Sequence, residues 1–373
     1  WYGNNWSIVN YENNGAELIE LVKIKYPRIS DPEFVIKNRK HYFKEAITYS
    51  ASGSKGATFR FLPANQIISG GGPGVIPALY KNINYLLAFF NSTLSTYIIN
   101  CLNPTVNTTQ GDMKRMPFVF PQQAIETTIS KLANDNISIK KLLCSYHIFE
   151  TNYEQSALIT FQGAALKDRV FAYLNDENAQ HTQVLINEAI INELIFEVYE
   201  LSDADREQVE TKMGLSIGSL AVFKEAKDAF LTQLQNPLAE VTEYIQSLPI
   251  TTFDEQQIKE IKEGFATLYQ SNNDLEEFCI RHQVNPINVW YWFREANIIP
   301  QARAAEIALE FLADAIRTIL TDDEDGIVPL VGLPGEPRLM DRLEAYCFSI
   351  GFTSAQIMQL DALVGRPINE YVE

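Results

Sequence analysis

The sequence lacks the features that mark several common protein classes. Only four cysteines occur in 373 residues, and none lies in a Cys-x-x-Cys pair or at zinc-ligand spacing: Cys101, Cys144, Cys279 and Cys347. We therefore expect reduced, buried thiols, as in a cytoplasmic protein. No apolar run reaches the ~18 residues typical of a membrane helix. No basic and apolar leader begins the chain at Trp1, so we expect a fragment of a larger protein with no membrane partner.

Catalytic and metal-binding motifs are also missing. The four histidines are isolated, and neither His-Glu-x-x-His nor Gly-x-Ser-x-Gly occurs. The segment Thr321–Gly332 lacks the first and last carboxylates of a calcium loop. The glycine-rich segment Ser69–Gly74 follows neither the dinucleotide-binding nor the Walker A pattern, so a surface turn is its expected structure. The sequence therefore predicts no metal site and no catalytic site within the chain.

Charge is distributed unevenly along the chain. The net charge of −17 combines +6 over residues 1–149, from 15 basic and 9 acidic residues, with −23 over residues 150–373, from 15 basic and 38 acidic residues. Neutralisation of phosphates by Lys and Arg supplies most non-specific affinity for nucleic acid. The first part of the sequence suits such a partner, whereas the second would repel it.

Hydrophobic periodicity predicts an α+β protein, with a small mixed α/β domain at residues 1–150 followed by a mostly α-helical region at 151–373. Alternation at Tyr42–Tyr49 and Ala57–Leu62 predicts a small sheet, and Trp6–Asn10 a further strand. The helical region has a candidate subdivision near residue 250. Its predicted helices include Ala164–Leu174, Gln183–Leu201, Asp203–Met213, Ser219–Leu234, Leu238–Leu248, Asp254–Tyr269, Ala302–Leu320 and Arg338–Ile350.

Residues 85–121 contain the main candidate site. An apolar helix leads into a hydroxyl-rich loop, and a predicted short strand at Pro117–Pro121 closes the segment. Asparagine and glutamine amides can bond adenine bidentately in the major groove, and basic side chains can hold phosphates. Taken alone, however, the segment favours a polar surface loop without such a role. The candidate residues are Asn107, Thr108, Thr109, Gln110, Lys114 and Arg115.

Two further segments have features of nucleic-acid binding. Basic residues are interleaved with aromatic ones between residues 37 and 60, which suits backbone contact and base stacking. Taken alone, this stretch nevertheless favours a solvated basic face. The candidates there are Lys37, Arg39, Lys40, Lys44, Lys55 and Arg60, with Ser52 and Ser54 in the intervening loop. Leu275–Asn297 has the rhythm of a helix-turn-helix. Its acidic surroundings favour a structural helical hairpin.

The order of several motifs resembles that of a known family. WYGNN, HYFKEAITYS, SGGGPG, YLLAFFNS and LNPTVNTTQGDMKRMPF resemble the target-recognition region of the adenine-specific DNA methyltransferases of bacterial phage-exclusion (BREX) systems, the PglX family. INELIFEVYELSDADREQVETKMG resembles the helical segment that follows, so the resemblance spans roughly residues 1–214. The helix, hydroxyl-rich loop and proline-ended strand are similar to those of restriction-modification specificity domains.

The resemblance implies a DNA-reading role without catalysis in this chain. Family members bind S-adenosylmethionine in a Rossmann-like domain that carries an Asn-Pro-Pro-aromatic motif for a flipped base. Asn103-Pro104, Asn236-Pro237 and Asn285-Pro286 lack the second proline and the aromatic residue. We therefore expect the cofactor and the methyltransferase domain to lie upstream, with double-stranded DNA and other phage-defence proteins as candidate partners. The alternative is a protein-interaction module that docks other defence components without reading DNA.

Overall fold

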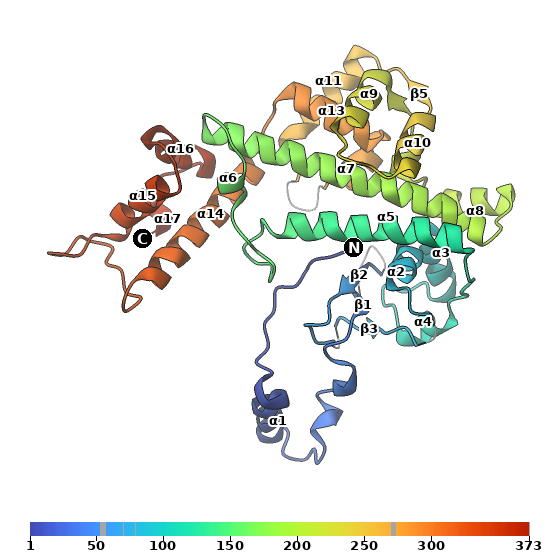
Figure 1. The fold of residues 1–373 in the computed structure, drawn as a ribbon, viewed down its shortest axis with the longest axis horizontal. Coiled ribbons are helices and arrows are strands. Elements are labelled where there is room, and N and C mark those ends of the chain that lie inside the picture. Colours follow the sequence, from blue (N-terminus) through green and yellow to red (C-terminus); the bar gives the residue numbers. More distant parts are fainter. Residues whose placement is uncertain (53–56, 70, 79, 270–273, 373) are drawn as a thin grey trace. The chain divides into compact units, whose positions relative to one another are not determined.

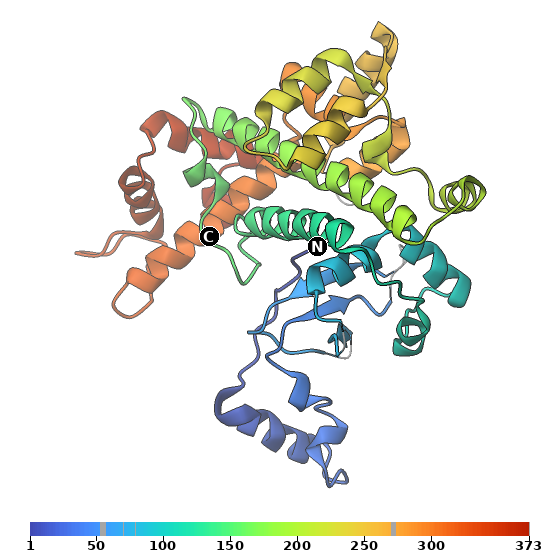
Figure 2. The same cartoon turned by 45° about the vertical axis from the view of Figure 1, so that its right-hand side comes forward.

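The chain forms two compact units in the computed structural model, which describes residues 1–52, 57–69, 71–78, 80–269 and 274–372 (Figures 1 and 2). Unit 1 comprises residues 1–141 and 190–215, and unit 2 comprises residues 142–189 and 216–373. Most elements are helices, and the sheets are small. The predicted α+β class with a mostly helical remainder is therefore confirmed.

Unit 1 is built on a three-stranded antiparallel sheet in the order β2-β1-β3. The strands are β1 (Ala46–Tyr49), β2 (Phe59–Leu62) and β3 (Gly74–Val75). They confirm the predicted sheet in shortened form, whereas Trp6–Asn10, which is described throughout, forms no strand. The Asn91 side chain bonds the backbone of the edge strand β2. Its amide oxygen accepts from the Phe59 N–H at 3.1 Å, and its amide nitrogen donates to the Phe59 carbonyl at 3.0 Å.

The apolar run after the sheet forms two helices, because Ser92 interrupts it. Ser92 has extended backbone geometry, and its hydroxyl accepts from the Ser95 N–H at 3.2 Å, which begins a new helix. Unit 1 contains α1 (Glu12–Lys25), α2 (Ile83–Asn91), α3 (Thr93–Leu102), α4 (Gln110–Arg115), most of α5 (Gln123–Cys144) and α8 (Asp203–Met213), with 3-10 turns η1 (Pro32–Phe34) and η2 (Arg39–His41). Both views place α1 beyond the sheet, on the side away from α2 (Figures 1 and 2).

Aromatic packing fixes the segment Pro117–Pro121, for which we predicted a strand. The segment is described in full and has no strand hydrogen bonding. Instead, the Phe118 ring packs on Tyr80 and Phe89 at centroid distances of 5.1 and 5.9 Å, and the Tyr199 hydroxyl donates to the Pro117 carbonyl at 2.7 Å. The strand prediction was wrong because the apolar side chains belong to a cluster of rings rather than to a sheet face.

One long helix, α7 (Leu166–Val198), takes part in both units (Figure 1). Its C-terminal part and α8 belong to unit 1, where Asn192 accepts from the Thr93 N–H at 2.9 Å and Gln208 donates to the Tyr97 hydroxyl at 2.6 Å. The units therefore differ from the predicted contiguous domains that meet at residue 150. With residues 190–215 included, unit 1 has 17 basic and 16 acidic side chains, a net charge of +1.

Unit 2 is a helical assembly around one aromatic core that includes Trp292, Phe293 and Phe311. A short parallel pair, β4 (Val222–Phe223) and β5 (Ile250–Thr251), and the 3-10 turns η3 (Ile217–Ser219) and η4 (Phe265–Thr267) connect its helices. These helices are α6 (Ala157–Thr160), the first part of α7, α9 (Lys224–Gln233), α10 (Ala239–Ser247), α11 (Glu255–Gly264), α12 (Leu275–His282), α13 (Pro286–Ala296), α14 (Gln301–Asp322), α15 (Leu339–Ser349), α16 (Ser354–Val364) and α17 (Asn369–Val372).

The predicted hairpin at Leu275–Asn297 consists of α12 and α13 and is part of the unit 2 core. Asn285 caps α13 by accepting from the Ile287 N–H at 2.9 Å, and Pro286 occupies the first helical position. Asn288 is fully buried and accepts from the Phe223 N–H at 2.8 Å. Because Asn288 bonds the protein backbone, it does not face a DNA groove, and the structural interpretation of the hairpin is supported.

The cysteines confirm the expectation of buried thiols only in part. Cys279 and Cys347 are buried, and burial raises the pKa of the Cys347 thiol to about 11, whereas Cys101 is exposed. None of the four, all of which lie in the described residues, forms a disulfide. Among the residues that the structure describes, no group of His, Cys, Asp and Glu side chains could hold a metal ion. Over the same residues, no helix combines the length and apolar character needed to cross a bilayer.

Candidate nucleic-acid interface

Three loops of unit 1 that are far apart in the sequence are joined by backbone contacts. Ser52 and Asn107 form an isolated antiparallel bridge, and the Thr108 N–H donates to the Ala51 carbonyl at 2.9 Å. The Ala51 N–H in turn donates to the Gly71 carbonyl at 3.4 Å. Ala51 and Ser52, which follow β1, are therefore joined both to the predicted reading loop and to Gly71 of the glycine-rich segment.

Asp112 anchors the reading loop, which we define as residues 103–110. Its Oδ2 atom accepts from Asn103 Nδ2 at 2.8 Å, from the Thr109 N–H at 2.9 Å and from the Thr109 hydroxyl at 2.7 Å. These bonds, first from Asn103 and then from Thr109, hold the pKa of the Asp112 carboxyl below its ordinary value. Asp112 was not among the predicted site residues, although Thr109-Gln-Gly-Asp112 is a capping-box pattern that identifies it as the partner of Thr109.

Replacement of Asp112 by Asn should loosen the reading loop. The amide removes the negative charge that all three donors face, so the Thr109 N–H should exchange with solvent deuterium faster in D112N. Because the pKa of Asp112 is lowered, the wild-type loop should keep this support above the ordinary pKa of aspartate and lose it as the pH falls through the lowered value. The control is Glu20→Gln on the exposed surface of α1. Equal exchange at Thr109 in both variants would contradict the anchoring role.

The structure divides the predicted base-reading residues into two groups. Ser52, Asn107 and Gln110 are exposed in the joined segments. Thr108 is only 8% exposed, and the Thr109 hydroxyl caps α4. We therefore leave both threonines out of the proposed reading set. Ser54 and Lys55 lie outside the described residues, as does Gly70 of the glycine-rich turn.

The basic candidates that the structure describes belong to separate segments of unit 1. Lys114 and Arg115 are exposed at the end of α4, beside the reading loop. Arg60 donates to the Ser50 hydroxyl at 3.3 Å and so lies at the serine-containing loop. Lys37, Lys40 and Lys44 are exposed in the segment that follows α1. Arg39 packs within that segment, donating to the Tyr11 hydroxyl at 3.2 Å and to the Asn14 carbonyl at 2.7 Å.

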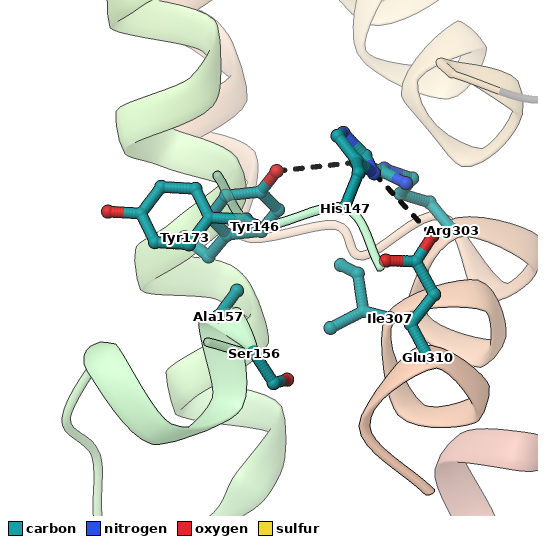
Figure 3. A pocket seen from close by; sticks show the side chains of 8 residues that line it. All are labelled: Tyr146, His147, Ser156, Ala157, Tyr173, Arg303, Ile307 and Glu310. Atoms are coloured by element: carbon teal, nitrogen blue, oxygen red, sulfur yellow. Dashed lines mark hydrogen bonds and ion pairs between the residues drawn. The ribbon is translucent and has the colours of Figure 1, made fainter. Parts of the chain in front are cut away.

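A small pocket in unit 2 is too narrow for a cofactor (Figure 3). It lies among Tyr146, His147, Tyr173, Arg303 and Glu310, and the space left in it is roughly that of one water molecule. Arg303 contacts the Tyr173 hydroxyl at 3.4 Å, and His147 Nδ1 lies 3.5 Å from Glu310 Oε1. A nucleoside-sized molecule such as S-adenosylmethionine does not fit there. The chemistry of the pocket is that of a buried polar network.

Comparison with known proteins supports the resemblance found in the sequence. No family model matches the chain. The chain is 27% identical over 241 residues to the adenine-specific methyltransferase BrxX of Escherichia coli O9:H4 (strain HS), which covers 62% of the chain and 18% of the relative. It is 24% identical over 221 residues to the adenine-specific methyltransferase PglX of Lacticaseibacillus casei (strain Zhang), covering 57% of the chain and 18% of the relative.

The matched regions span only about 18% of the length of each of these relatives. The comparison therefore concerns a small part of a long protein. They agree with the family inferred from the motifs between Trp1 and Gly214. Over these regions the chain is thus similar to part of the adenine-specific methyltransferases BrxX and PglX.

Proposed function

We propose that this chain holds duplex DNA and reads a short sequence on behalf of an adenine-specific (N6) DNA methyltransferase of a bacterial anti-phage system. The observation that carries the proposal is the joining of Ser52 to Asn107, which brings exposed polar side chains from separate loops together. The similarity to BrxX and PglX supports the methyltransferase context.

In this proposal, reading and holding are done by different side chains. The amides of Asn107 and Gln110 would pair with base edges, assisted by the Ser52 hydroxyl. Lys114 and Arg115 would hold the phosphates that flank the site. Since unit 1 has a net charge of only +1, its affinity for DNA would depend on these local cations and not on a general positive field. Lys37, Lys40 and Lys44 would supply a second group of phosphate contacts.

Under this proposal, methyl transfer takes place in another domain of the full protein. The chain lacks the Asn-Pro-Pro-aromatic motif. We place the cofactor and the chemistry in an upstream methyltransferase domain of the same protein, acting in the cytoplasm. The chain described here would position the adenine for that domain.

Two variants separate reading from holding. Gln110→Ala should change sequence preference by about 1–3 kcal/mol at one base pair, because one bidentate contact is lost. Lys114→Ala should weaken binding to all sequences about equally and lower the salt dependence by roughly one counterion. Fluorescence anisotropy on a panel of duplexes at several salt concentrations measures both effects.

The matched controls are Gln122→Ala and Lys131→Ala, which remove exposed side chains of the same types from other parts of unit 1. Neither control should alter preference or salt dependence to the same degree. Equal losses on every duplex for Gln110→Ala and Lys114→Ala would contradict the assigned roles. Absence of salt-dependent DNA binding by the whole chain would overturn the DNA-reading proposal.

One observation favours the alternative of a protein-interaction module. The loop between α14 and α15 exposes four aliphatic side chains close to the acidic run Asp322–Asp325: Ile327, Leu330, Val331 and Leu333. Such a concentration of exposed apolar residues is typical of a protein contact. If the chain fails to bind DNA, docking to another defence component through unit 2 becomes the better proposal.

A further inference from the structure

Val106 occupies an unusual place in the reading loop. Its side chain is 60% exposed, although it is aliphatic. On one side, Thr105 donates its hydroxyl and its N–H to Asn103 Oδ1 at 2.7 and 3.1 Å. On the other side, the Asn107 carbonyl accepts from Asn103 Nδ2 at 2.8 Å. The residues on both sides of Val106 are therefore hydrogen-bonded to the side chain of Asn103.

Other residues in and next to the loop are buried, whereas Val106 is exposed. Thr108 and Asp112 are 8% and 6% exposed, so the segment turns two polar residues inward and the valine outward. A single exposed aliphatic residue is common on protein surfaces and has no meaning by itself. Here its neighbours are the exposed Asn107 and, across the bridge, Ser52. Val106 is therefore an exposed aliphatic side chain that lies beside exposed side chains able to form hydrogen bonds with bases.

The chemistry of the major groove gives these side chains a specific match. Adenine offers an acceptor and a donor that fit an amide, and thymine is the one standard base that presents a methyl group there. A loop tip that enters the groove can touch base edges on either side. The β-branched side chain of valine is restricted at χ1, so its methyl groups are presented with a small loss of freedom.

We infer that the tip of the reading loop recognises A·T base pairs through both partners, with Asn107 on adenine and Val106 against the C5 methyl group of thymine in the same or the adjacent pair. This inference rests on the proposed DNA-reading function. It adds the kind of base pair recognised and a residue that determines specificity.

The test uses the whole chain and a duplex enriched from a random-sequence library for tight binding. Each thymine is replaced in turn by deoxyuridine, which removes only the methyl group. At one position the wild-type affinity should fall about three- to fivefold, the effect expected for one buried methyl group. Val106→Ala should bind the original duplex with a similar loss, and deoxyuridine at that position should cause no further loss.

A second substitution separates the two contacts at the same position. When the A·T pair is replaced by a G·C pair, 5-methylcytosine should bind wild type more tightly than cytosine, because the methyl group returns without the adenine. This difference should vanish in Val106→Ala and persist in Val119→Ala, which truncates another exposed aliphatic side chain of unit 1. Thermal melting of the variants checks that the fold is kept.

The outcomes distinguish this inference from the proposed function. Sequence-selective binding without any deoxyuridine effect, or the same deoxyuridine effect in wild type and Val106→Ala, would overturn the thymine contact and leave DNA reading intact. Failure of the library to yield any preferred sequence would overturn both.

Discussion

Replacement of Arg303 by methionine should destabilise unit 2 by about 3–5 kcal/mol, because it leaves a buried carboxylate without its partner. Arg303 on α14 donates to Glu177 Oε1 at 2.8 Å, and both side chains are almost completely buried. Glu177 also accepts from the Tyr173 hydroxyl at 2.8 Å. The change of Trp290 and Trp292 fluorescence in urea measures the free energy of unfolding, since both residues are buried in unit 2.

The stability lost in R303M should depend on pH in a defined direction. Burial by itself would raise the pKa of Glu177, but the attraction of Arg303, with smaller contributions from His181 and His147, lowers it below the ordinary value. The wild-type pair therefore stabilises the fold above the ordinary pKa of glutamate, and this contribution is lost as the pH falls through the lowered value. In R303M the largest attraction that opposes burial is lost, so the pKa of Glu177 should rise. The deficit of the variant should therefore shrink as the pH is lowered toward about 4.

Two comparisons test the cause. Arg281→Met removes an exposed arginine of α12 and should change stability by less than about 0.5 kcal/mol. Adding Glu177→Gln to R303M should recover part of the loss, since an amide costs less to bury than a carboxylate. A loss in R303M that is independent of pH and unaffected by Glu177→Gln would show that the side-chain volume, and not the charge pair, is responsible.

Replacement of Asn285 by alanine should cost about 3–5 kcal/mol, because one buried amide supports three backbone groups. Its Oδ1 caps α13 through the Ile287 N–H, and its Nδ2 donates to the carbonyls of Gly218 at 3.1 Å and Leu220 at 2.8 Å. Loss of a cap costs about 1 kcal/mol, and each unsatisfied buried group costs about 1–3 kcal/mol. Urea unfolding followed by tryptophan fluorescence again measures the effect.

Asn285→Ser separates the contribution of the helix cap from that of the two hydrogen bonds that Asn285 donates. The serine hydroxyl can still cap α13 but is too short to replace both donations to the η3 segment, so Asn285→Ser should lie between wild type and Asn285→Ala. The difference between the two variants should be about 1 kcal/mol, the value of the cap. Asn134→Ala, an exposed asparagine on α5, is the control and should have little effect on unit 2. Wild-type stability in Asn285→Ala would contradict the supporting role.

Local signals in the sequence predicted local structure well. Ser202 caps α8 and forms a capping box with Asp205, and Gly214 ends the same helix with a φ of +86°. The same holds for the turn before Pro286, where the asparagine and proline suit the start of a helix. In each case a few neighbouring residues determine the geometry, so tertiary contacts are not needed to infer it.

The long helix α7 shows where periodicity failed. We predicted two helices separated by Asn175–Thr182, because that segment is polar. Its residues are nevertheless helical, and Glu177, Asn178 and Thr182 are buried. Asn178 accepts from the Tyr269 hydroxyl at 2.8 Å, a partner that lies far away in the sequence. Periodicity assumes that polar residues face solvent, so it cannot detect a helix that buries its polar residues against distant partners.

The candidate site was also only partly predictable. The reading loop is recognisable from its hydroxyl and amide side chains, but its pairing with Ser52 depends on how the chain returns to the sheet. The exposure of Asn107 and Gln110, in contrast to the burial of Thr108, follows from that pairing and from the bonds to Asp112. A single sequence contains no direct signal for which member of a polar run faces outward.

The placement of residues 190–215 in unit 1 has a consequence for synthesis on the ribosome. Unit 1 receives Asn192 and Tyr199 from this segment, and these residues support Thr93 and Pro117. Residues 142–189, which belong to unit 2, are made in between. At a synthesis rate of about 5–20 residues per second, residues 190–215 are made several seconds after residue 141. During that time unit 1 lacks the end of α7 and α8. The nascent chain thus exposes its aromatic cluster during elongation, a period in which a chaperone would find it accessible.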